Sequence, residues 1–149
     1  MKTHPRQEFL FYIEDDLSAP LVDAMRLAVE RLHSRRDWVI APPVFVDTVD
    51  SPANSEIDEP IRTVGGTLEL YSALPPWGDQ LPKSLDRAHL EEIEIVILTL
   101  RKLSEEFDIE IACELDGVQV GWISSGVLSK GLEHGLLGPW RAAISSSGL

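Results

Sequence analysis

Cysteine is nearly absent from this 149-residue chain, because Cys113 is its single thiol. One cysteine cannot build an internal disulfide framework or a multi-cysteine zinc site, so both are excluded. Long apolar runs are missing as well. The stretch from Ile93 to Leu100 is interrupted by Glu94 and falls well short of the roughly 20 apolar residues that a bilayer requires. We therefore expect a cytoplasmic protein without a membrane span.

Basic residues are scarce relative to acidic ones. The chain has 13 Lys and Arg against 25 Asp and Glu, for a formal net charge of −12. This excess disfavours direct binding to nucleic acid or to an anionic membrane, because both are negatively charged. The charge is compatible with protein partners that have a basic or neutral surface.

Motifs of catalysis and cofactor binding are also missing. The pair Gly65-Gly66 and the glycines Gly135 and Gly138 lack the spacing of a phosphate-binding loop. The serine groups near residues 124 and 145 lack the glycine frame of a nucleophilic serine. We therefore expect no cofactor, no metal site and no enzymatic activity.

What is present predicts one domain over residues 1–149, since 44% of the chain is hydrophobic and can form a core. The segment 8–14 has the composition of a strand, and Ser18 with Pro20 predicts the start of a helix. Residues 38–40 and 44–46 are short extended pieces split by prolines, which favours an edge position. The segment 62–72 alternates apolar and polar side chains, as a half-buried strand does.

The second half contains the strongest helix signal, with Asp86 as its expected N-cap and apolar residues at every third or fourth position up to Phe107. Asp116-Gly117 between two β-rich runs predicts a tight hairpin. The tail at 130–144 predicts short helical pieces broken by glycines. This order indicates an α+β fold: a mostly antiparallel sheet with two main helices on one face, of the split βαβ, ferredoxin-like kind with an added hairpin strand, and a short C-terminal helix.

Asp86, His89 and Glu92 are three residues apart and would share one helix face. They could form a carboxylate-oriented base or part of a metal site. The simpler interpretation, which we favour, is that Asp86 caps the helix, Glu92 lies near its positive end and His89 is exposed.

The tryptophans and the cysteine are expected to be mainly structural. We predict that Trp38, Trp122 and Trp140 lie in the core, whereas Trp77, in a proline-rich turn, either seals the core edge or meets a partner. Cys113 alternates with apolar neighbours and is expected to be a buried, inert thiol.

The densest acidic segment runs from Asp47 to Pro60 and contains no Lys or Arg. We expect an exposed loop here, at about 47–60, and its simplest interpretation is a solvated loop. The alternative is that it forms a partner-binding surface with the polar face of the next strand and the turn after it. The predicted surface comprises Asp47, Asp50, Glu56, Asp58, Glu59, Glu69, Tyr71, Trp77 and Asp79.

These features predict an acidic, non-enzymatic binding protein that neutralises a partner with a basic cleft, such as a toxin that acts on nucleic acid. Small size, negative charge and the lack of a catalytic motif resemble the class of bacterial immunity proteins, without a diagnostic residue. Two alternatives stay open: an enzyme or small-ligand module that uses Asp86, His89 and Glu92, and a structural domain that self-associates through the edge at 38–46.

Overall fold

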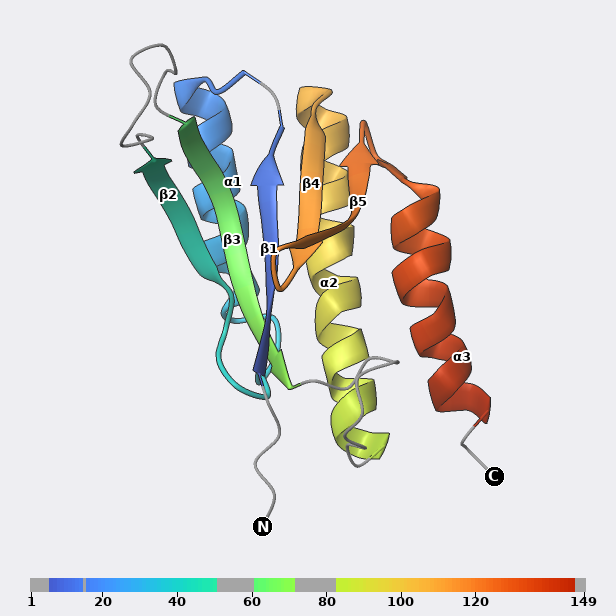
Figure 1. The fold of residues 1–149 in the computed structure, drawn as a ribbon. Coiled ribbons are helices and arrows are strands. Elements are labelled where there is room, and N and C mark those ends of the chain that lie inside the picture. The colour runs from blue at the N-terminus through green and yellow to red at the C-terminus, as the bar shows by residue number, and fades with distance from the viewer. Residues whose placement is uncertain (1–5, 15, 51–60, 72–82, 147–149) are drawn as a thin grey trace.

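The computed structural model of the chain describes residues 6–14, 16–50, 61–71 and 83–146. Its strands form one sheet in the order β2-β3-β1-β4-β5-β6, and each neighbouring pair is antiparallel (Figure 1). The strands are β1 (Arg6–Ile13), β2 (Val44–Asp50), β3 (Ile61–Tyr71), β4 (Glu110–Leu115), β5 (Val118–Ser124) and β6 (Val127–Leu128). The helices are α1 (Ala19–Leu32), α2 (Lys83–Phe107), the π-helix η1 (Gly131–Leu137) and α3 (Gly138–Ser146).

The connectivity confirms the predicted α+β class. Strand β3 lies between β1 and β2, which α1 connects, and β1 lies between β3 and β4, which α2 connects. These two interleaved βαβ units are the split arrangement of a ferredoxin-like fold. Strands β5 and β6 extend the sheet beyond β4, as an added hairpin.

The molecule has two layers, because α1 and α2 lie side by side on one face of the sheet (Figure 1). Alternate residues of β1 point to this face and are buried, among them Phe9, Phe11 and Ile13. They pack against apolar stripes of the helices, such as Met25 on α1 and Val96 on α2. The other face of the sheet, which we call the open face, has no described helix over it.

Helix α1 forms as its sequence predicts. Ser18 is the N-cap, and its hydroxyl accepts a hydrogen bond from the backbone N–H of Leu21 at 3.3 Å. Pro20 stands in the first turn, where its missing N–H is harmless. Leu21, Met25, Val29 and Leu32 form the buried stripe.

Helix α2 begins earlier than predicted. It starts at Lys83, so Asp86 lies in the first turn and is not the N-cap. The helix ends at Phe107, and the next residue, Asp108, adopts a positive φ of 52°. The backbone N–H of Ile109 then bonds the carbonyl of Ser104, which is a Schellman-type ending. A contact with Trp140, described below, gives Asp86 a different role from capping.

The hairpin at Asp116-Gly117 is confirmed, since φ is 51° and 79° at these residues, as a type I′ turn requires. A second turn of the same kind, Ser125-Gly126, joins β5 to β6 with φ of 46° and 84°. The sequence analysis did not predict this turn. A Ser-Gly pair is a weaker signal than Asp-Gly, and β6 is only two residues long.

Strand β2 lies at the sheet edge, as expected, but it continues through Asp50. Asp47 to Asp50 are therefore strand and not loop, paired with Ile61 to Val64. The rest of the predicted acidic loop lies outside the described residues. Residues 38–40 are not a strand. Among the described helices, none has the length and apolar character needed to cross a membrane.

Candidate functional site

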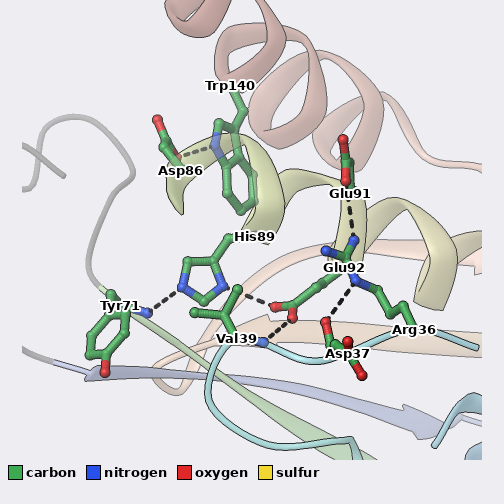
Figure 2. A network of polar contacts seen from close by, with 9 residues as sticks. All are labelled: Arg36, Asp37, Val39, Tyr71, Asp86, His89, Glu91, Glu92 and Trp140. Atoms are coloured by element: carbon green, nitrogen blue, oxygen red, sulfur yellow. Dashed lines mark hydrogen bonds and ion pairs between the residues drawn. The ribbon is translucent and has the colours of Figure 1, made fainter. Parts of the chain in front are cut away.

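One face of α2 carries a network of polar side chains (Figure 2). Asp86, His89 and Glu92 follow one another at three-residue spacing, so they line up along the helix. His89 and Glu92 are both 0% exposed, and Nδ1 of His89 lies 3.0 Å from Oε1 of Glu92. The expectation that His89 is an exposed first-turn residue is therefore wrong.

The hydrogen bonds assign the proton of the histidine ring. The backbone N–H of Tyr71 donates to Nε2 of His89 at 3.3 Å, so Nε2 carries no hydrogen. The neutral ring must then carry its proton on Nδ1, which donates to Glu92. The second carboxylate oxygen of Glu92 accepts the backbone N–H of Val39 at 2.6 Å. The polar atoms of both side chains thus have partners.

This network connects segments that are far apart in the sequence. Tyr71 ends β3, Val39 lies in the connection between α1 and β2, and Asp86 reaches the C-terminal helix α3 through Trp140. Oδ1 of Asp86 accepts the indole N–H of Trp140 at 2.6 Å (Figure 2). Each polar residue of the α2 face therefore holds a different segment to the helix.

The same geometry argues against use of this histidine as a general base. A base must bring a free ring nitrogen within hydrogen-bond reach of a substrate proton. In His89 that nitrogen, Nε2, accepts a backbone amide, and the ring is fully buried. The Asp86 carboxylate points to Trp140 and not to the pair of His89 and Glu92. The triplet that the sequence singled out as possible chemistry is a structural clamp.

The predicted partner-binding residues lie partly within the described structure. Asp47 and Asp50 are on β2, and Glu69 and Tyr71 are on β3. The other members of the predicted surface lie outside the described residues: Glu56, Asp58, Glu59, Trp77 and Asp79.

The described members point in different directions. Asp47 is opposite Val64, whose side chain is buried on the helix side, so Asp47 shares that side of the edge strand. Glu69 is opposite Glu8 on the open face. The Tyr71 ring lies edge-on to the imidazole of His89, with ring centroids 5.8 Å apart.

Two of these carboxylates already have internal partners. Asp47 makes a bidentate ion pair with Arg62, at 2.8 and 2.9 Å, and this pair lowers the pKa of Asp47. Glu69 bonds Arg6 at 3.2 Å. The pairing explains how β2 continues into the acidic segment, because Arg62 neutralises a carboxylate of the neighbouring strand.

The open face of the sheet is more acidic than this predicted set suggests. Strand alternation and register place glutamates from three adjacent strands on it, namely Glu8, Glu14, Glu69, Glu110 and Glu114. Within the described strand residues on this face, Arg6 is the cation, and it is paired with Glu69. The sequence analysis missed most of these glutamates because strand order brings them together from distant segments.

Aromatic side chains cross the middle of the open face. Register aligns Gly65, Tyr12, Ala112 and Trp122 in one row across four strands. Trp122 is 40% exposed, so the prediction that it lies in the core is wrong. The adjacent Ile123 takes the core position. Trp140 is buried as predicted, and Trp38 is partly buried against the core.

A shallow hollow of about 430 Å³ lies beside Tyr12. Its lining includes Glu14 and Glu114 from the open face, together with Leu10 and Arg62. The Tyr12 hydroxyl donates to Oε2 of Glu114 at 2.8 Å. Partial burial, this hydrogen bond and the charge of Glu14 raise the pKa of Tyr12 well above its ordinary value.

The hollow is chemically suited to a cation. Two carboxylates approach the same hydroxyl, which has one proton and donates it to Glu114. Their like charges repel, and a positive group between them would relieve that repulsion. Arg62 also lines the hollow, but its guanidinium is engaged by Asp47. An aromatic ring next to carboxylates is a good environment for a Lys or Arg side chain from another molecule.

Cys113 is buried on the helix side of β4, as predicted. Burial raises the pKa of its thiol to about 12, so the thiolate needed for nucleophilic chemistry does not form near neutral pH. Within the described ranges, no three His, Cys, Asp or Glu side chains are grouped in a way that could hold a metal ion.

Comparison with known proteins identifies no relative: no family model matches the chain, and neither a curated protein nor a solved structure matches it.

Proposed function

We propose that this chain is a non-enzymatic binding protein that uses the open face of its sheet to occupy the basic cleft of a protein partner. The partner class that fits is a toxin that acts on nucleic acid, with this chain as its bacterial immunity protein. The observation that carries the proposal is the hollow between Glu14 and Glu114 beside Tyr12, on a face rich in carboxylates. A cleft that binds phosphates presents the Lys and Arg residues that such a surface attracts.

Two further features support this function. The net charge of −12 would accelerate encounter with a basic protein through long-range attraction. Trp122 is half-exposed on β5 of the open face, and an exposed aromatic side chain of this kind can anchor a partner and lengthen the lifetime of a complex. The carboxylates would stand where substrate phosphates lie, so the partner would be blocked by occupation of its site.

The test uses the proteins encoded beside this chain's gene. Each neighbour is expressed alone and together with this chain, and growth is followed. We expect one neighbour to arrest growth and this chain to restore it. With purified proteins, the association rate constant should fall about tenfold or more between 50 and 500 mM salt, while the dissociation rate constant changes little.

Matched variants locate the surface. Replacing both hollow carboxylates, as Glu14→Gln with Glu114→Gln, should weaken binding at least about tenfold, because both charges that face the partner's cation are lost. Glu133→Gln changes an exposed acid on η1, away from the open face, and should leave affinity unchanged. If no neighbouring protein is both toxic and bound, or if the association rate ignores salt, the proposed function is wrong.

A further inference from the structure

The helix layer carries a second surface of opposite chemistry. A groove of about 480 Å³ runs between α1 and α2 on the side that faces away from the sheet. Its apolar lining includes Leu27 of α1 and Leu98 of α2, which are 42% and 45% exposed. Large apolar side chains left this exposed and side by side indicate a contact surface.

Cations surround this apolar lining. Arg31 and Arg35 follow Leu27 at four-residue spacing, and Lys102 follows Leu98 at the same spacing. The two helices run antiparallel, so the arginines and the lysine lie at opposite ends of the groove (Figure 1). Glu106 is the acidic residue of the lining, near the lysine end.

These cations differ from most of the other cations that the structure describes. The described arginines that form ion pairs with carboxylates are Arg6, Arg26, Arg36, Arg62 and Arg141. In the part of the chain that the structure describes, the charged groups of Arg31, Arg35 and Lys102 make no ion pair or hydrogen bond. In a protein with nearly twice as many acids as bases, unpaired cations gathered around one apolar groove form a distinct surface.

From this geometry we infer that the groove binds an acidic amphipathic helix of a protein partner, with apolar residues over Leu27 and Leu98 and carboxylates toward the cations at both ends. The exposure of the two leucines shows that the groove is shallow. A small ligand usually needs an enclosed pocket that buries most of its surface, whereas a helix can lie in the furrow between two others. The carboxylates supply the complement to Arg31, Arg35 and Lys102.

The test selects binders from a displayed library of random 16-residue peptides at 150 mM salt, so that it does not depend on one designed sequence. The wild-type chain is the bait, and a variant with Arg31→Glu and Lys102→Glu is the counter-selection. We expect enriched peptides to carry apolar residues at helical spacing flanked by Asp or Glu. The most enriched peptide should bind the wild type at least about tenfold more tightly than the double variant by fluorescence anisotropy.

The control is Arg87→Glu, which reverses an exposed cation of α2 outside the groove lining and should leave peptide affinity unchanged. Circular dichroism of each variant verifies that it is folded. The inference is overturned if enriched peptides are basic or lack helical spacing, if none is enriched, or if Arg87→Glu weakens binding as much as the groove variant. It is also overturned if the chain dimerises and Leu27→Ser abolishes the dimer, because the groove would then be covered by a second copy. None of these outcomes depends on the toxin partner of the open face.

Discussion

The open face of the sheet and the outer surface of the helix layer differ in the charge that they offer to solvent. The open face presents glutamates around Tyr12 and Trp122, and its cation Arg6 is paired. The helix layer presents unpaired cations on either side of Leu27 and Leu98. The net charge of −12 therefore does not describe either surface, because charges farther apart than about 8 to 10 Å are largely screened at physiological salt. Each face can therefore attract a partner of a different sign.

The polar network on α2 and the side chains of the open face also differ in burial. In the helix layer, the side chains of His89 and Glu92 are fully buried and bonded to each other. Side chains on the open face are partly exposed, and their contacts can be exchanged for contacts with a partner.

Trp140, buried in the core, and Trp122, half-exposed on the open face, provide the strongest test of this contrast. Trp140→Ala should lower the free energy of unfolding by about 4 kcal/mol, since it empties a large core site and leaves Asp86 without its indole partner. Trp122→Ala should cost about 1 kcal/mol or less, because the ring is half-exposed. Urea denaturation measures both, and equal losses would contradict the distinction between the faces.

The clamp on α2 should be the next most sensitive feature. Glu92→Ala removes the acceptor of His89 Nδ1 and of the Val39 amide. It should cost about 3 kcal/mol, because the fully buried His89 N–H and the partly buried Val39 N–H both lose their partner. Glu91→Ala, one residue away, removes only an exposed pair with Arg36 and should cost about 0.5 kcal/mol. A Glu92 effect as small as the Glu91 effect would show that the network does not hold the segments together.

The row of residues across the open face depends on a close backbone approach at Gly65. A Cβ added there would lie 1.8 Å from the carbonyl oxygen of Phe11 on β1, so β1 and β3 would have to separate. We expect Gly65→Ala to lower stability by about 2 to 3 kcal/mol. Gly135→Ala is the control, since nothing lies within 4 Å of its added Cβ. If the unfolding curves of Gly65→Ala and Gly135→Ala coincided, this packing of β1 against β3 would be contradicted.

Burial of the Cys113 thiol predicts that the stability of the fold depends on pH. The pKa of Cys113 is about 12 in the folded protein, whereas an unfolded cysteine titrates near 8.5. Between these values the unfolded chain has lost a proton that the folded chain retains, so stability decreases as pH rises. Between pH 8 and 9.5 the wild type should lose about 1 kcal/mol more than Cys113→Ala in urea titrations. A parallel pH profile for the two proteins would refute the assignment.

Local signals explain what could be predicted from the sequence. The turn at Asp116-Gly117 depends on two residues that tolerate positive φ, and α1 depends on Ser18 and a four-residue apolar repeat. Alternation over 62–72 predicted a half-buried strand, and the structure confirms it, with Leu68 and Leu70 both buried. These features need no knowledge of distant residues.

The errors came from residues whose surroundings are set by other elements. His89 has the local sequence of an exposed helix position, and it is buried only because Tyr71 and Val39 meet it from other segments. Trp122 was expected in the core because it is large and apolar, whereas pairing with Ala112 places it on the open face. Neither environment can be read from neighbours in the chain.

The acidic excess, the main helices and strands, and the α+β class could be read from the sequence alone, because they follow from composition, periodicity and turn chemistry over short distances. Which charged side chains lie next to one another depends on the tertiary structure. The glutamates of the open face come from β1, β3 and β4, and the cations of the groove come from α1, α2 and the turn after α1. Strand register and helix packing bring such residues together, and both depend on contacts between segments far apart in the chain.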